Sequence, residues 1–364
     1  MQTTYDNTTI GLDLAKNVFY CTEMNQHRRV VRQTRLRQSQ VLGYFSALEA
    51  SKVRCVAMEA CGGAHFWARK FEEFGLPVRL LPPRWVKAYV MNNKTDANDS
   101  VAIAEAAQRP KLHAVAVKSV AQQDLTMLHG LRRQALKTRT QWYNSIRSHL
   151  SERGLVTGRS RARLDELMRR VLSHDPADHK DLDLSQVSGE FRAMLSHEVQ
   201  QLRHVCEKVV YYSNRIEAVG AKLDEVRRLQ TVPGIGPLVA SALAASAGNA
   251  GEFECGRAFA AWLGLTSRQH SSGGREKSGA ISKRGDRYVR TMLIHGVRTV
   301  FCAARRNPDN MDPLYCKARR IAVHSAPNIA VVAVANQMAR ISWVILTEGV
   351  EYDPLKASKG GPNQ

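Results

Sequence analysis

The chain has 364 residues, and its 53 Lys and Arg against 33 Asp and Glu give a formal net charge of +20 at pH 7. A hydrophobic content of 44% and a charged content of 24% are ordinary for folded proteins and exclude wholesale disorder. The seven cysteines form no CxxC pair, which disfavours a disulfide framework and a structural zinc site. The length predicts two or three domains, and the positive charge predicts a polyanionic partner.

The chain shows no sign of export or membrane insertion. Asp6 arrives early and no apolar segment of a signal peptide follows it. No apolar run approaches the ~20 residues that cross a bilayer. We therefore expect a cytoplasmic protein with no membrane partner.

Residues 1–112 are expected to form an α/β domain. The hydrophobic pattern predicts strands at Thr8–Leu14, Val18–Glu23, Arg29–Thr34, Val53–Met58 and Val78–Leu81. It predicts helices at Gln38–Ala50, Ala64–Phe74 and Ala97–Ala107. The resulting order, three strands and then alternating helices and strands, resembles that of a ribonuclease-H-like domain.

Four carboxylates fall where they can share a site. Asp13 lies in the first strand, Glu59 ends the fourth, and Asp96 and Asp99 stand three residues apart at a helix start. A carboxylate in an apolar strand is costly unless a positive group pairs with it, and a divalent cation meets that demand. Carboxylate oxygens are ligands that Mg²⁺ prefers. The pattern predicts a Mg²⁺ or Mn²⁺ site, and two ions about 4 Å apart suit phosphodiester chemistry.

A simpler interpretation exists for each acid taken alone. Asp13 can pair with Lys16 or Lys94, and Asp96 can cap the helix that follows it. Four acids together, at the places that a ribonuclease-H-like fold uses, favour the metal site.

Residues 113–228 are expected to form a helical arm. Apolar residues recur every seven positions at Leu195, Leu202, Val209, Ile216 and Leu223, with a second row at Val205, Tyr212, Val219 and Val226. This pattern is typical of a coiled coil, which packs within one chain or joins subunits. Residues 128–170 carry 11 basic and 3 acidic side chains, and we expect Arg161 and Arg163 to contact nucleic-acid phosphates.

Residues 229–350 are expected to form a mostly helical third domain, followed by a loose tail at 351–364. Its first segment, TVPGIGPLVASAL, places Gly234 and Gly236 before an alanine-rich helix. Such a turn can grip phosphate oxygens through backbone N–H groups. A tight turn into a packed helix explains the same glycines equally well.

A Gly- and Ser-rich loop within residues 264–290 carries the second chemical pattern. Ser271 and Ser272 precede two glycines, which allow the backbone to bend freely. The basic side chains around it, expected to bind nucleic acid, are Arg268, Arg275, Lys277, Lys283, Arg284, Arg287 and Arg290. A serine here can attack phosphorus if its proton leaves and guanidinium groups stabilise the developing charge. The alternative is a phosphate-binding turn with no covalent role.

Taken in order, IGLDLAK, MEA, KTDANDS, TVPGIGP and SSGG…ISKRGDRYVR resemble the DEDD transposases of bacterial insertion sequences of the IS-one-ten type. The Piv DNA invertases share this pattern. The resemblance covers roughly residues 8–346. It departs from the family at Ser267, where proline is usual, and at Ser100, where alanine is usual.

The resemblance implies a RuvC-like catalytic domain, a coiled-coil arm and a C-terminal transposase domain, in a bacterial protein that works at the nucleoid. It implies that Asp13, Glu59, Asp96 and Asp99 hold the metal ions. The family's nucleophilic serine falls on Ser272, with Ser271 as the substitute. The family also implies a non-coding bridge RNA that pairs with donor and target DNA. Its homo-oligomers, from dimers to tetramers, combine one subunit's acids with another's serine.

Two other classes of protein share parts of the pattern. A RuvC-like Holliday-junction nuclease uses the same four acids with water as the nucleophile and forms no covalent intermediate. A non-catalytic nucleic-acid-binding scaffold needs only the basic regions. The complete set of acids argues against the scaffold, and the SSGG segment argues against the simple nuclease.

Overall fold

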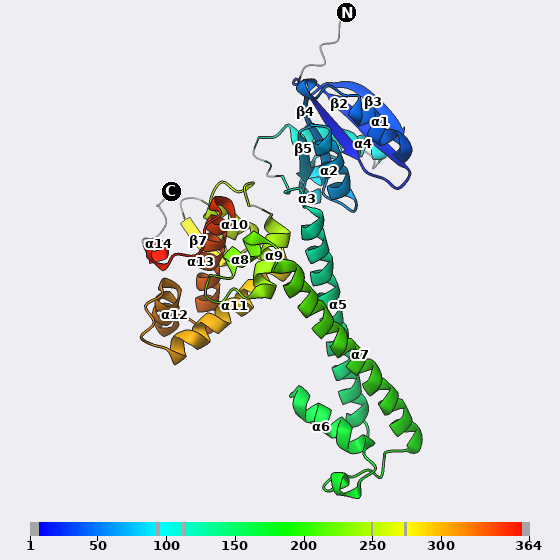
Figure 1. Cartoon of the computed structure of the whole chain (residues 1–364), viewed down its shortest axis with the longest axis vertical. Helices are drawn as coiled ribbons and strands as arrows, with labels where there is room; N and C mark the ends of the chain where they lie inside the picture. Colours follow the sequence, from blue (N-terminus) through cyan, green and yellow to red (C-terminus); the bar gives the residue numbers. More distant parts are fainter. Residues whose placement is uncertain are drawn as a thin grey trace, which may run out of the picture.

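The computed structural model describes residues 7–91, 95–110, 112, 114–248, 250–272 and 275–358, and the side chains of residues 270–278 lie outside this description. Figure 1 shows a sheet with its helices at the top, a long pair of helices that runs downward, and a helical region at the left.

The N-terminal region is a five-stranded mixed sheet in the order β3-β2-β1-β4-β5. The strands are β1 (Thr8–Asp13), β2 (Val18–Met24), β3 (Val30–Arg37), β4 (Val53–Glu59) and β5 (Val78–Leu81). β1, β4 and β5 run parallel, and β2 and β3 form the predicted antiparallel meander. All five predicted strands are therefore confirmed, with ends that shift by up to three residues.

Helices cover both faces of this sheet. Side chains alternate along each strand, so neighbouring residues contribute to the cores on opposite faces. Ile10 and Val56 face a core with α1 (Gln38–Ser46) and α2 (Ala64–Glu73). Cys55 and Ala57 face a second core with α4 (Asp96–Ala107) and α3 (Pro83–Val86). The short 3₁₀ turns η1 (Ala50–Lys52) and η2 (Lys87–Tyr89) complete the region. The sequence pattern did not predict α3.

Two long helices form the arm. α5 (Val120–Ser151) leaves the sheet region and α7 (Gly189–Gly220) returns beside it, with α6 (Arg161–Leu172) at the far end (Figure 1). At 32 residues each, α5 and α7 are about 48 Å long. Leu195 and Leu202 of the predicted heptad row pack on α5 and α6 of the same chain.

The heptad row ends earlier than predicted. α7 stops at Gly220, so Leu223 and Val226 belong to the following turn and to α8 (Asp224–Leu229). Ile216, the last member inside α7, packs on Leu125 of α5. The first row is buried within the chain at Leu195, Leu202, Val209 and Ile216, whereas Val205, Tyr212 and Val219 of the second row are only partly buried.

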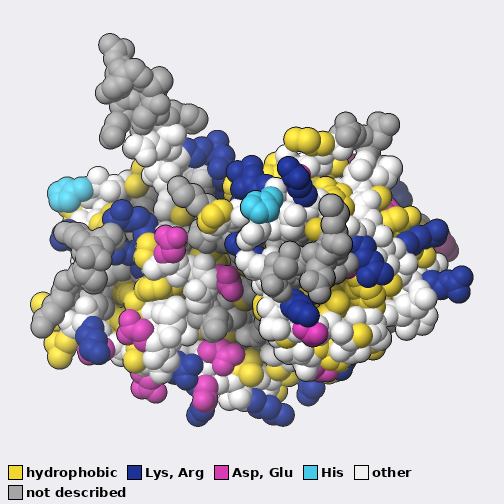
Figure 2. Space-filling model, turned by 90° about the horizontal axis from the view of Figure 1, so that it is seen from above, with side chains coloured by type: hydrophobic (Ala, Val, Ile, Leu, Met, Phe, Trp, Pro, Cys, Tyr) yellow, Lys and Arg dark blue, Asp and Glu magenta, His cyan; other side chains and the backbone are white. Residues whose placement is uncertain are grey.

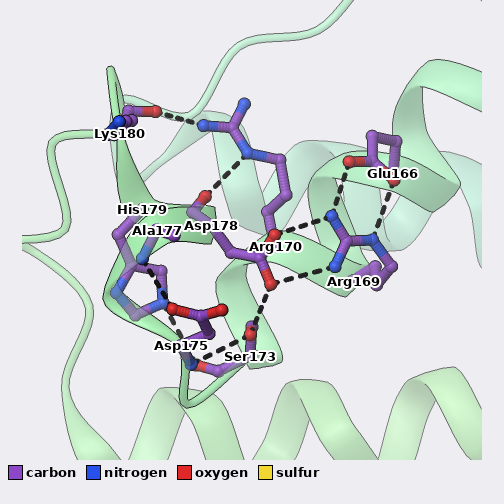
Figure 3. Close-up of polar contacts among 9 residues, drawn as sticks. All are labelled: Glu166, Arg169, Arg170, Ser173, Asp175, Ala177, Asp178, His179 and Lys180. Carbon is purple, nitrogen blue, oxygen red and sulfur yellow. Dashed lines mark hydrogen bonds and ion pairs between the residues drawn. The ribbon is translucent and has the colours of Figure 1, made fainter.

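A hydrogen-bond network closes the tip of the arm (Figure 3). Arg169 donates to both carboxylate oxygens of Glu166 and to both of Asp178, at 2.8–3.0 Å. Asp178 belongs to the short turn η3 (Pro176–His179) and also accepts from the Ser173 hydroxyl at 2.6 Å. The network holds the start of the polar segment 174–188 against the end of α6.

The C-terminal region is one helical core with a β-hairpin attached. Its helices after α8 are α9 (Pro237–Ala247), α10 (Gly256–Trp262), α11 (Arg287–Arg306), α12 (Pro313–His324), α13 (Pro327–Glu348) and α14 (Pro354–Ser358). The segment predicted as a Gly/Ser loop is instead a hairpin of β6 (Ser267–Ser272) and β7 (Arg275–Ile281).

α13 has the length and apolar composition of a membrane span, but half of its most apolar window is buried in the helical core, as in a core helix. One further expectation for this region needs correction. The tail is not loose at its start, because the Tyr352 backbone N–H donates to Thr231 Oγ1 at 2.9 Å and its hydroxyl donates to Asp312 at 3.2 Å.

Candidate active site and nucleic-acid surfaces

Asp13 and Glu59 lie at the same edge of the sheet. β1 and β4 run parallel with Leu12 opposite Met58, and the two acids are the next residue on each strand. The thiol of Cys61 responds to both of them: burial raises its pKa, and the charges of Glu59 and Asp13 raise it further. Both carboxylates therefore lie close to one point beyond the strand ends.

α4 packs directly on β1 because Gly11 has no side chain. A Cβ at Gly11 would lie 2.6 Å from Ala104 N and still closer to Ser100 O. At the other end of α4, the Gln108 side chain donates to the backbone oxygen of Asn25 at 3.0 Å, next to the start of β1. α4 thus runs opposite to β1, and its first turn lies towards the edge that carries Asp13.

That first turn carries Asp96 and Asp99. Thr95 is the N-cap, and its hydroxyl accepts from the Asn98 N–H at 3.2 Å, so Asp96 is not the capping residue. Lys94, suggested above as a partner of Asp13, lies outside the described residues.

Ser100 adds a polar contact between α4 and the sheet. It occupies a position where alanine is usual in the resembling family, and it is buried with its hydroxyl 2.7 Å from that of Thr22 on β2. This contact and the close approach at Gly11 fix the distance between α4 and the sheet.

The four carboxylates fit a divalent cation by their chemistry, and they lie towards one edge of the sheet. Carboxylate oxygens are hard ligands that suit Mg²⁺ and Mn²⁺. Within the described ranges, however, no three His, Cys, Asp or Glu side chains are grouped closely enough to hold a metal ion. The edge thus brings the predicted ligands to one side of the sheet without drawing them into a closed cluster.

Arg290, predicted to contact nucleic acid, is buried instead. Its side chain is 7% exposed and donates to the Leu263 carbonyl at 2.8 Å and towards that of Arg284 at 3.4 Å. Gly264 and Gly285 have φ of 73° and 89°, and a Cβ on Gly285 would collide with Trp262 O. The prediction for Arg290 was wrong, because the KRGD segment packs on the end of α10 and the Arg290 side chain is buried between them.

His129 joins the arm to this hairpin base, and sequence reasoning missed it. Its Nδ1 lies 2.8 Å from the Tyr288 hydroxyl and its Nε2 lies 3.0 Å from the Ser241 hydroxyl. Because Ser241 donates to Pro237 O, Nε2–H donates to Ser241 and Nδ1 accepts from Tyr288. Burial lowers the pKa of His129 to about 4, so the ring is neutral at pH 7. A lone histidine in a helix gives no sequence signal for this role.

The remaining predicted phosphate contacts are mostly exposed. Arg161 and Arg163 begin α6, and the Arg161 guanidinium lies 5.5 Å from the centre of the Tyr143 ring. The others that the structure describes as exposed are Arg268, Lys283, Arg284 and Arg287. The side chains of Ser271, Ser272, Arg275 and Lys277 lie outside the described ones.

The two glycines of the predicted phosphate-binding turn differ. Gly234, with φ of 84°, packs against Gly296 of α11, and a Cβ would lie 2.7 Å from Gly296 O. Gly236 is exposed at the start of α9 with open space around it. Only Gly236 is placed where a phosphate has room to approach.

The positive charge is unevenly distributed over the surface. In Figure 2 basic side chains gather near the upper centre, whereas most visible acidic side chains lie in the lower left half.

In Figure 1 the hairpin strand β7 lies at the left of the C-terminal region and the sheet lies at the upper right. A single chain therefore does not bring the hairpin to the carboxylate edge.

Comparison with known proteins identifies the family. The model described as "Transposase IS116/IS110/IS902 family" matches residues 226–315, and a DEDD transposase model matches residues 10–153. The DEDD match fits the ribonuclease-H-like arrangement of the sheet and indicates dependence on a divalent metal.

Several curated relatives align with nearly the whole chain. A "Probable family 20 transposase" from Pseudomonas aeruginosa is 42% identical over 95% of this chain and 98% of its own length. The transposase of insertion element IS1111A from Coxiella burnetii is 36% identical over 95% and 92%. The chain therefore belongs to the IS116/IS110/IS902 family of transposases, which are enzymes that cut and rejoin DNA.

Proposed function

We propose that this transposase moves its insertion sequence by metal-dependent phosphoryl transfer with a serine nucleophile. The observation that carries the proposal is the convergence of Asp13, Glu59 and the first turn of α4 on one sheet edge. Asp13, Glu59, Asp96 and Asp99 would hold a divalent cation there, which would supply charge stabilisation at the phosphate.

In the proposed step the Ser272 hydroxyl oxygen attacks phosphorus, a phosphorus–oxygen bond of the DNA backbone breaks, and a strand end leaves as a hydroxyl. The hydroxyl proton of the serine passes to a carboxylate of the edge, and the leaving oxygen takes up a proton from that carboxylic acid or from water. Exposed guanidinium groups near the hairpin base, such as Arg284 and Arg287, stabilise the charge that develops on the phosphate. Attack by another strand's hydroxyl reverses the step and rejoins the DNA without ATP. Ser271 is the substitute for Ser272.

The site is proposed to be composite, because the hairpin and the carboxylate edge lie on different parts of one chain (Figure 1). In a dimer or tetramer, the serine of one subunit would meet the acids of another. The proposal keeps the three-part division at 1–112, 113–228 and 229–350, with α5 and α7 as a coiled-coil arm. The hydrophobic cores of the sheet, the arm and the C-terminal region support three parts, although Val226 of α8 packs in the C-terminal core.

A bridge RNA is proposed to select the donor and target DNA. Two exposed basic regions support a second nucleic acid: one begins α6 at Arg161, and the other surrounds the hairpin base at Arg284. Phosphate contacts of this kind hold a nucleic acid without reading its sequence, and base pairing with an RNA supplies the sequence choice. We place the enzyme in the bacterial cytoplasm at the nucleoid.

Mixing two inactive variants tests the composite site. Asp99→Asn and Ser272→Ala should each abolish strand exchange on donor and target DNA. Co-assembled subunits should recover part of the wild-type activity, because a complete set of groups forms between them. If the mixture stays inactive although both variants bind DNA and assemble, the site is not composite. If Ser272→Ala cleaves like wild type and Ser271→Ala does not, the nucleophile is Ser271. If the variant that lacks both serines cleaves like wild type, water is the nucleophile and the RuvC-like nuclease is the better description.

A further inference from the structure

An exposed basic and aromatic segment follows β5. In α3 and η2, Val86 is buried and anchors the segment, whereas Arg84, Trp85 and Lys87 are exposed. Trp85 is 43% exposed, and the other four tryptophans, all of which the structure describes, are less exposed. The Arg84 guanidinium lies 5.2 Å from the centre of the Trp85 ring. The segment therefore presents a large flat ring and positive charge to solvent.

This segment lies next to the carboxylate edge. Leu81, the last residue of β5, pairs with Glu59 on β4. Trp85 is four residues further on, so its Cα lies within about 14 Å of that of Leu81. In Figure 1, α3 lies between the sheet and the start of α5. A strand held at the carboxylates thus passes within reach of Trp85.

A second aromatic side chain follows the neighbouring strand. Phe66 stands near the start of α2, seven residues after Glu59, and is 46% exposed with its ring 5.2 Å from that of Trp67. On the α3 side, Arg109 lies 5.6 Å from the Tyr89 ring and adds a further positive charge. Residues 82–91 contain no acidic residue. The charge and the flat rings together fit nucleic acid better than an apolar protein surface.

We propose that Trp85, backed by Arg84, is a stacking platform for an unpaired base of the DNA strand that is cut. Every base has an aromatic face, so a tryptophan can hold an unstacked base without reading its sequence. Arg84 and Lys87 neutralise the adjacent phosphates. The platform would keep the strand open beside the phosphate held at the carboxylate edge. This inference rests on the proposed function, because it takes DNA to be the strand at that edge.

The test is a binding measurement on the full-length protein in EDTA, where no chemistry occurs. The probe is a fluorescein-labelled 12-nucleotide oligo(dT), compared with a blunt DNA duplex and an oligo(U) RNA of equal length. Binding of unlabelled oligo(dT) should quench tryptophan fluorescence in wild type and not in Trp85→Ala. By anisotropy, Trp85→Ala should bind oligo(dT) about tenfold more weakly, whereas Trp85→Phe keeps a ring and stays within about threefold of wild type.

Duplex affinity should be unchanged in both variants. A control variant at an exposed apolar residue of α12, Val323→Ala, should bind all probes like wild type. Equal oligo(dT) affinity in wild type and Trp85→Ala would overturn the platform. An equal loss for single strand and duplex would also overturn it, as would an effect of Trp85→Ala on oligo(U) alone. Because nothing is cleaved, a failure of the serine mechanism would leave this result unaffected.

Discussion

Replacing Gly11 with alanine should lower the rate of DNA cleavage, although the four carboxylates are unchanged. The new Cβ would lie 2.6 Å from Ala104 N and closer still to Ser100 O. Both are backbone atoms of α4, so no side chain can rotate away to make room. Ordinary contact begins near 3.4 Å, so α4 must retreat from β1 by about 1 Å.

Two consequences of different size follow. Overpacking of this kind costs about 1–3 kcal/mol of folding free energy. The retreat also moves Asp96 and Asp99 relative to Asp13, and a misplacement of about 1 Å in a reacting geometry can lower a rate by about a hundredfold. The loss of activity should therefore exceed what the loss of stability explains at a temperature where the variant remains folded.

The assay compares the rate of DNA strand cleavage with stability in urea. Gly43→Ala is the matched control, because Gly43 lies in α1 with open space around it and alanine there should stabilise by about 0.5–1 kcal/mol. Gly43→Ala should cleave like wild type. Wild-type cleavage by Gly11→Ala would refute the claim that α4 is seated on β1 and positions the two acids.

Three other predictions concern the hairpin base, the arm and the charge. Arg290→Met should lower the free energy of unfolding by about 2–3 kcal/mol, because buried carbonyls lose their donor, whereas exposed Arg287→Met should cost less than about 0.5 kcal/mol; equal losses in urea would contradict this. The pKa of His129 is lowered from 6.5 to about 4, so the unfolded chain takes up a proton first and stability falls as pH drops from about 6.5 towards 4. His129→Gln should flatten part of that slope in urea titrations at several pH values, and an unchanged slope would show that the ring is not held neutral. Arg284→Glu with Arg287→Glu should reduce the salt dependence of DNA affinity by about 0.9 in log–log slope for each phosphate that these side chains no longer neutralise, and a constant slope would show that other residues bind the phosphates.

Local patterns were enough to predict the sheet and the places of Asp13 and Glu59 on its strands. In Val53–Glu59 the residues from Cys55 to Met58 are apolar, and Glu59 marks where this run ends. The direction of α4 was not predictable, since the contact that reveals it joins Gln108 to Asn25, 83 residues away in the sequence. Gly11 in IGLDLAK allows the backbone of α4 to approach β1 closely, and this role became evident only from the structure.

The predictions that were wrong relied on residue type alone. Arg290 was predicted to bind nucleic acid because it is positively charged, although Gly264 and Gly285 leave the space in which its side chain is buried. The hairpin strands lack apolar alternation, so the SSGG segment has the sequence pattern of a loop. The heptad row continues through Gly220 in the sequence, whereas the helix ends there and the next apolar residues belong to a different helix.

The proposed covalent bond between Ser272 and DNA can be detected directly. Protein, donor and target DNA, RNA and Mg²⁺ are incubated, denatured and analysed for protein-linked DNA, with the linked residue mapped by mass spectrometry. Wild type should form an adduct at Ser272, and Ser272→Ala should lose it while still binding DNA. Asp99→Asn should also form none, because the acids are needed for the attack. Recombination by wild type with no adduct at any stage would contradict the account and leave water or a DNA hydroxyl as the nucleophile.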